Sequence, residues 1–151
     1  MKRAAYLLAL LWLPALCLAQ APPATRPGDA IVGEWMTENR DARVNIFRAT
    51  NGTYYGQIVW LEDPNEADGT PKRDTENPDP ALRTKPILGL QILRGFRYDP
   101  DDNEWTGGRV YDPESGNDYS GYLALEGPNR LKLRGYVGIS WLGRTSYWTR
   151  N

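Results

Sequence analysis

The chain has 151 residues, contains one cysteine and no histidine, and carries a formal charge of −1 at neutral pH. The balance of 18 basic and 19 acidic residues leaves no cationic surplus for binding phosphates, which argues against a nucleic-acid partner. The lack of histidine removes the usual general base and the most common transition-metal ligand, so we predict no catalytic residue, no metal site and no cofactor.

Residues 1–19 have the pattern of a secretory signal peptide. A basic start precedes an apolar run that is interrupted by Pro14, and the small residues Cys17 and Ala19 lie three and one positions before a cleavage site that follows Ala19. Leu16 stands where a lipoprotein signal needs a small residue before Cys17, which argues against lipid anchoring. We therefore expect an exported protein, periplasmic or extracellular, whose mature chain has no transmembrane segment.

Residues 20–30 contain three prolines and are predicted to form a disordered leader. From residue 31 onward, short runs rich in Val, Ile, Tyr, Trp and Thr alternate with turn residues, which predicts one all-β domain over 31–151. The predicted strands are 31–38, 42–49, 53–62, 90–99, 103–111, 117–126, 129–138 and 142–150.

Most connections between these strands are short, which predicts antiparallel neighbours. Asn51-Gly52 is a strong hairpin signal, and in "DPESGN" (112–117) the aspartate can cap a turn while Gly116 supplies a left-handed residue. The connection 63–86 is different, because it is long and contains five prolines. Such a segment is either a lid or binding loop or a proline-stiffened surface excursion, and the sequence leaves both interpretations open.

Alternation along the strands predicts one apolar face. Val44 and Ile46 oppose Arg43, and Leu131, Leu133 and Val137 are predicted to share a face of another strand. Glycines within the strands permit the coiling that lets a sheet close on itself. The predicted fold is therefore an eight-stranded antiparallel up-and-down β-barrel.

Barrel closure would bring the first and last strands together. Gly33 and Trp35 lie on the first strand, and Trp148 lies near the end of the last one. We predict that Arg150 or Arg144 covers the Trp35 indole in a cation–π contact at one end of the barrel. This arrangement resembles the lipocalins, whose first strand carries Gly-x-Trp and whose last strand supplies an arginine over it.

A longer resemblance covers nearly the whole mature chain. The ordered segments "GEW", "YYGQIVW", "DTENPDPALRTKPILGLQIL", "WTGGRVYDPESGNDYSGYL", "LKLRGYVG" and "LGRTSYWTR" are similar to the exported bacterial family called domain of unknown function 2147. The resemblance implies a small lipocalin-like barrel without an established activity. It also places Asp74, Asn77 and Pro78 in the family's polar motif, without a catalytic role.

Three functions remain open. The leading hypothesis is non-catalytic binding of a small hydrophobic or amphipathic ligand, apolar or aromatic in character, in the mouth of the barrel. The alternatives are an envelope interaction module with a filled interior and an aromatic surface, and a hydrolase that uses carboxylates around Asp74. The candidate ligand-binding residues are Trp35, Trp60, Asp74, Asn77, Trp105, Arg109, Tyr111 and Tyr119.

Overall fold

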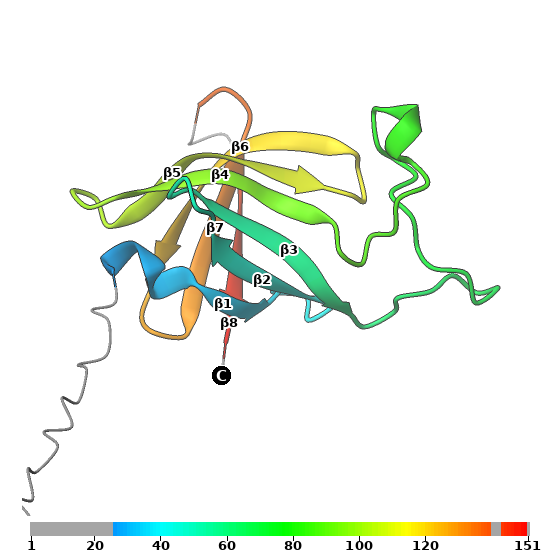
Figure 1. The fold of residues 1–151 in the computed structure, drawn as a ribbon, viewed down its shortest axis with the longest axis horizontal. Helices are drawn as coiled ribbons and strands as arrows, with labels where there is room; N and C mark the ends of the chain where they lie inside the picture. The colour runs from blue at the N-terminus through cyan, green and yellow to red at the C-terminus, as the bar shows by residue number, and fades with distance from the viewer. Residues whose placement is uncertain (1–25, 140–142, 151) are drawn as a thin grey trace, which may run out of the picture.

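The computed structural model describes residues 26–139 and 143–150, and these form a closed barrel in which each strand pairs with its sequence neighbour (Figure 1). The predicted eight-stranded antiparallel barrel is confirmed. The strands are β1 (Gly33–Met36), β2 (Ala42–Arg48), β3 (Tyr54–Leu61), β4 (Gln91–Asp99), β5 (Glu104–Asp112), β6 (Asn117–Leu125), β7 (Arg130–Tyr136) and β8 (Gly143–Thr149), with 3-10 helices η1 (Pro27–Ile31) and η2 (Pro80–Leu82).

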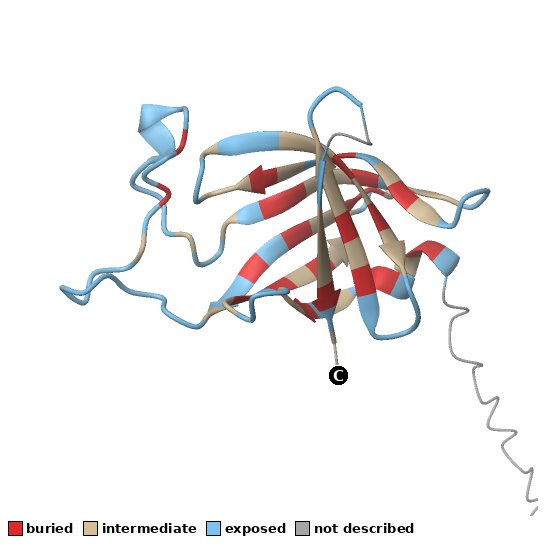
Figure 2. Ribbon diagram, turned by 180° about the vertical axis from the view of Figure 1, so that it is seen from behind, coloured by how far each residue is buried: buried red, intermediate tan, exposed pale blue. Residues whose placement is uncertain are grey.

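Burial alternates along the strands, as Figure 2 shows. In β2, Val44 and Ile46 are buried whereas Arg43 is exposed, as the sequence pattern predicts. In β7, Leu131 and Leu133 face the core. The prediction for Val137 is wrong, because β7 ends at Tyr136 and Val137 is 70% exposed in the following loop.

One end of the barrel is closed by η1, which lies under the ring edges of two core tryptophans. The indole Nε1 of Trp35 donates to the Ile31 carbonyl at 2.8 Å, and that of Trp105 donates to the Gly28 carbonyl at 2.9 Å. These two bonds satisfy buried indole donors and attach η1 to the core. The described part of the predicted leader therefore differs from the expectation of disorder, whereas residues 1–25, with the predicted signal peptide, lie outside the described residues.

The seam between the first and last strands is narrow, because β1 and β8 share only the pair Met36↔Thr149. Arg150 completes it. Its guanidinium lies 4.3 Å from the Trp35 ring centroid and donates to the carbonyls of Pro128, Val32 and Ala30. The predicted cation–π closure is confirmed for Arg150.

Arg144 is not a closure residue. It pairs in register with Gly135, which places it at the opposite end of β8 from Arg150. Of the other predicted closure residues, Gly33 lies beside Arg150, whose guanidinium is the nearest described group to an added Cβ, and Trp148 is buried within the core.

Glycines in the strands make room for large core side chains. An added Cβ at Gly108 would lie 2.4 Å from the Phe96 ring, and one at Gly56 would lie 2.8 Å from Leu93. Gly108 follows a register shift between β5 and β6, where Gly107 has a φ of 71°. The middle of the barrel is therefore packed with side chains.

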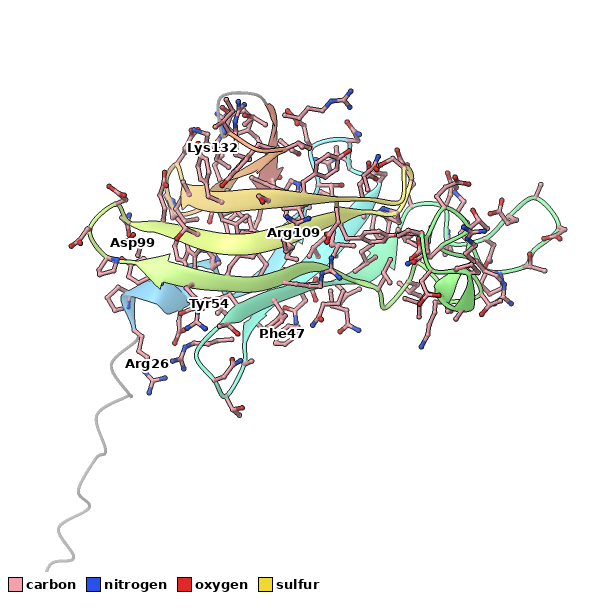
Figure 3. The ribbon with its side chains drawn as sticks, turned by 90° about the horizontal axis from the view of Figure 1, so that it is seen from above. Arg26, Phe47, Tyr54, Asp99, Arg109 and Lys132 are labelled. Carbon is pink, nitrogen blue, oxygen red and sulfur yellow. The ribbon has the colours of Figure 1, made fainter. Side chains whose placement is uncertain are left out.

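Four connections lie at the end opposite η1, and the longest joins β3 to β4. Figures 1 and 3 show this segment projecting away from the barrel, and in Figure 3 it lies at the far end from Asp99. It contains two isolated antiparallel β-bridges, one between Asn65 and Pro71 and one between Arg73 and Pro86. The segment is thus a defined excursion with its own hydrogen bonds.

The short "DPESGN" connection is a turn, as predicted. The Asp112 carboxylate accepts hydrogen bonds from the Glu114 N–H and the Ser115 hydroxyl, and Gly116 has a φ of 69°. Among the described residues, no helix is long and apolar enough to cross a membrane.

Candidate binding site at the open end of the barrel

The end of the barrel opposite η1 contains a cavity of about 610 Å³. This volume lies within the range of roughly 300–1,000 Å³ that is usual for small-molecule sites. Its apolar wall consists of Ala42, Ile58, Leu61, Ile87, Ile92, Val110, Leu133 and Trp148. Because these side chains come from strands around the barrel and from Ile87 in the long connection, the cavity is a cup with an apolar wall.

The rim of this cup is charged. Its acidic residues are Glu38, Asp41, Glu62, Asp63, Asp112 and Glu114, and its basic residues are Lys72 and Arg144. The acids come from the β1–β2 connection, from the segment after β3, and from the β5–β6 hairpin. The site therefore combines an apolar interior with a rim rich in carboxylates.

A second cavity of about 560 Å³ adjoins the first. The two share Val110, Leu133, Arg144 and Ser146 among their lining residues, and Tyr119 lines the second one. Together they form the mouth of the barrel.

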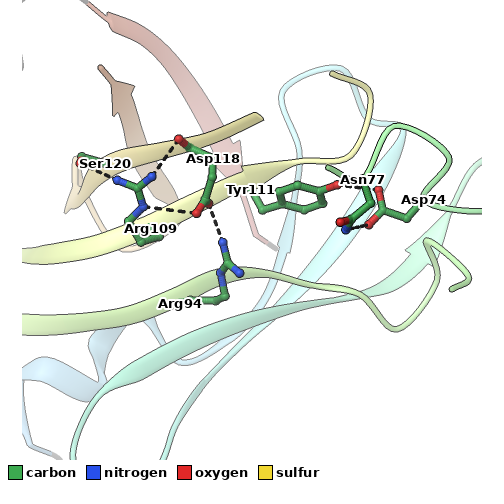
Figure 4. Close-up of polar contacts among 7 residues, drawn as sticks. All are labelled: Asp74, Asn77, Arg94, Arg109, Tyr111, Asp118 and Ser120. Carbon is green, nitrogen blue, oxygen red and sulfur yellow. Dashed lines mark hydrogen bonds and ion pairs between the residues drawn. The ribbon is translucent and has the colours of Figure 1, made fainter. Parts of the chain in front are cut away.

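The long connection is attached to the barrel through a buried carboxylate (Figure 4). Asp74 is fully buried, and its Oδ1 accepts a 2.7 Å hydrogen bond from the Tyr111 hydroxyl, while its Oδ2 accepts one of 2.7 Å from Asn77 Nδ2. Burial and then the hydrogen bond to Asp74 raise the pKa of Tyr111 well above its usual range. Tyr111 therefore stays protonated as the donor.

Asn77 continues this network within the loop. Its side-chain oxygen accepts from the Asp79 N–H at 2.9 Å, and its carbonyl accepts from Arg83 Nε at 2.7 Å. Asp74 and Asn77 are the only buried residues in the described segment 62–90. Their hydrogen bonds thus supply this segment with a small polar core. Both residues belong to the polar motif that the family resemblance implies.

A second polar cluster lies on the outer surface beside Tyr111 (Figure 4). Asp118 on β6 forms ion pairs with Arg94 on β4 and Arg109 on β5, and Arg109 also donates to the Ser120 hydroxyl at 3.0 Å. These residues connect three adjacent strands. Arg109 faces outward and does not line the mouth.

The structure separates the candidate ligand-binding residues into four places. Tyr111 and Tyr119 line the mouth cavities, whereas Asp74 and Asn77 form the loop core. Trp35 and Trp105 are buried at the closed end, where carbonyls of η1 accept hydrogen bonds from their indole N–H groups. Trp60 and Arg109 lie on the outer surface, where Arg43 covers the Trp60 ring at 5.4 Å.

Several cavity residues were absent from the sequence-based candidates, among them Ile58, Leu133 and Ser146. Strand alternation identifies them as inward-facing, but alternation does not say which end of a strand lies at an open mouth. The sequence feature that could have identified the closed end is the start of η1. Pro27 is typical of the first position of a helical turn, and the apolar Ile31 at the end of that turn is buried.

The proposed hydrolase site is not supported by this geometry. Both carboxylate oxygens of Asp74 are engaged by Tyr111 and Asn77, and Asp74 is not among the residues that line the described cavities. Over residues 26–139 and 143–150, no group of three His, Cys, Asp or Glu side chains is arranged to hold a metal ion.

An up-and-down barrel of eight strands with an arginine over the first-strand tryptophan is a lipocalin-like fold. A solved structure of a protein from the human pathogen Helicobacter pylori, described as belonging to the lipocalin family, matches this fold with a TM-score of 0.68 and 23% sequence identity. The match covers 80% of this chain and 82% of the other.

The chain belongs to the bacterial family DUF2147, described as uncharacterised proteins conserved in bacteria, and it matches that family over residues 33–150. This confirms the resemblance that the sequence segments show. No curated protein matches the sequence.

Proposed function

We propose that this protein is a non-catalytic binding protein that holds a small hydrophobic or amphipathic ligand in the mouth of its barrel. The observation that carries the proposal is the apolar-walled cavity of about 610 Å³, open at one end of a barrel whose other end is plugged by η1. The cup is large enough for one small molecule, and burial of apolar ligand surface would supply the driving force.

The competing interaction module is less well supported. It requires a filled interior and an exposed aromatic patch. Among the described residues, the exposed large hydrophobic side chains include one aromatic residue, Trp60, and Arg43 partly covers its ring. The remaining exposed aliphatic residues do not replace an aromatic surface.

The predicted signal peptide supports export to the periplasm or beyond, where the protein would bind its ligand. Mass spectrometry of the protein recovered from an exporting host tests this step. Cleavage after Ala19 is expected, and a mature chain that retains residues 1–19 would contradict export through this signal.

Ligand binding is tested by titration with the neutral apolar dye N-phenylnaphthylamine, whose fluorescence rises in an apolar site. In the variant Ser146→Trp an indole would fill the mouth, because Ser146 lines both cavities and lies two residues from buried Trp148. We expect a loss of dye affinity of about tenfold or more.

Ser120→Trp is the matched control. It introduces the same side chain on the outer face of β6, where Ser120 contacts Arg109, and it should bind the dye like the parent protein. Absence of dye binding to the parent, or equal binding by Ser146→Trp, would reject the proposal.

A further inference from the structure

The charge of the rim identifies a class of ligand for the proposed site. We infer, on the basis of the proposed binding function, that the mouth selects a cationic amphiphile: a molecule with a positively charged head and an apolar tail. Six carboxylates and two cations line the same cavity, so the rim carries a surplus of negative charge.

No ion pair within residues 26–139 and 143–150 neutralises these carboxylates. The ion pairs of the described residues use other acids, namely Asp29, Asp118 and Glu126. Where the rim carboxylates accept hydrogen bonds, the donors are neutral: Asp41 accepts from the Thr37 hydroxyl, and Glu38 accepts from the Tyr147 N–H. Neutral donors leave the negative charge in place.

The two rim cations are outnumbered. Lys72 lies in the long connection and Arg144 lies on β8, whereas acids occupy three of the connections around the opening. A cleft with low-dielectric walls and one dominant sign of charge concentrates ions of the opposite sign. The rim would therefore repel a ligand with a carboxylate head and attract a ligand with an ammonium or guanidinium head.

The apolar wall below the rim favours a ligand that has an apolar tail as well as a charged head. Ile58, Ile92 and Leu133 line the interior of the same cavity, and they offer no hydrogen bonds from their side chains. A simple inorganic cation would leave this surface uncovered, whereas an alkyl or aromatic tail would bury it.

The test compares three probes with the same ten-carbon chain: decylammonium and decanoate below their micelle concentrations, and decanol below its solubility limit. Isothermal titration calorimetry of the full mature protein measures each affinity. At low salt we expect decylammonium to bind about tenfold more tightly than decanoate, with decanol between them, and added salt should shrink this difference.

The double variant Glu62→Gln/Asp63→Asn should weaken decylammonium binding about threefold or more and leave decanol binding unchanged. Asp101→Asn/Asp102→Asn is the matched control, since it makes the same change in total charge in the β4–β5 turn at the closed end. That control should bind every probe like the parent protein.

The outcomes separate the two proposals. If none of the three probes binds, the binding function itself fails. If decanol and decanoate bind at least as tightly as decylammonium, the binding function stands and the selection of cations is overturned. An affinity for decylammonium that is unchanged by salt and by the rim variant would also overturn it.

Discussion

The Tyr111 hydroxyl on β5 donates a 2.7 Å hydrogen bond to Asp74, which lies 37 residues earlier in the chain, in the long β3–β4 connection. This bond joins the barrel wall to a segment whose other residues are mostly exposed. The long connection also packs closely against the β5–β6 turn, because an added Cβ at Gly116 would clash with the Glu76 carbonyl. The excursion is thus fixed at its middle as well as at its two ends.

Replacing Tyr111 with phenylalanine should loosen the long connection and leave the barrel folded. The variant keeps the ring but removes the donor, which leaves a buried carboxylate with one partner fewer, at a cost of about 1–3 kcal/mol. Limited trypsin digestion measures the effect, since Lys72, Arg73 and Arg83 lie in this segment. We expect cleavage there to become about fivefold faster or more.

Tyr147→Phe provides the control for this prediction. Its ring stays in place under Arg130, whose guanidinium lies 4.2 Å from the ring centroid, and its digestion should match that of the parent. Equal digestion of Tyr111→Phe and the parent would show that the hydrogen bond to Asp74 does not hold the segment.

Arg150→Ala should destabilise the barrel by about 1–3 kcal/mol, because it removes three hydrogen bonds to carbonyls and the contact with the Trp35 ring. Arg150→Lys should recover only part of this loss, since an ammonium cannot reproduce the planar fork of the guanidinium. Urea unfolding followed by tryptophan fluorescence gives the free energies.

Arg144→Ala at the open mouth should change stability by less than about 0.5 kcal/mol, and a loss equal to that of Arg150→Ala would contradict the assignment of the seam.

The fold could be predicted from the sequence because alternation and turn residues are local signals. Val44 and Ile46 fall inside for the same reason that Arg43 falls outside, and Asn51-Gly52 joins the strands that flank it. The choice between Arg144 and Arg150 could not be made in this way. It depends on the offset of β8 against β1, which is fixed by the single pair Met36↔Thr149.

The site was predicted less well because it depends on which end of the barrel is open. Trp35 and Trp105 are aromatic and inward-facing, as a pocket residue would be, but η1 covers them. The partnership of Asp74 with Tyr111 is a contact between a loop and a distant strand, and neither spacing nor periodicity encodes it. The family resemblance pointed to Asp74 and Asn77, and the structure shows what they contact.

Tyr54 should make the protein sensitive to alkaline pH. Burial and then its 2.9 Å hydrogen bond to Asp29 raise the pKa of Tyr54 from 10.0 to about 12. Because the folded state favours the protonated phenol, this contribution is complete below pH 10 and is lost as the pH rises from 10 to about 12. The difference in unfolding free energy between the parent and Tyr54→Phe should therefore fall by about 1–3 kcal/mol over that interval. A difference that is constant with pH would contradict the pKa shift.

The packed middle of the barrel gives a matched pair of glycine variants. Gly108→Ala would place a methyl group 2.4 Å from the Phe96 ring, and Phe96 is fully buried, so the ring or the strand must move. We expect a loss of about 1–3 kcal/mol in the free energy of unfolding, as for other overpacked cores.

In Gly135→Ala the nearest described atom would be Tyr119 Cβ at 3.6 Å, an ordinary contact near the mouth. Its stability should be unchanged or slightly raised, because alanine has less backbone freedom to lose on folding. Urea unfolding of both variants distinguishes the packed middle from the open end, and equal stabilities would mean that Phe96 does not fill the space above Gly108.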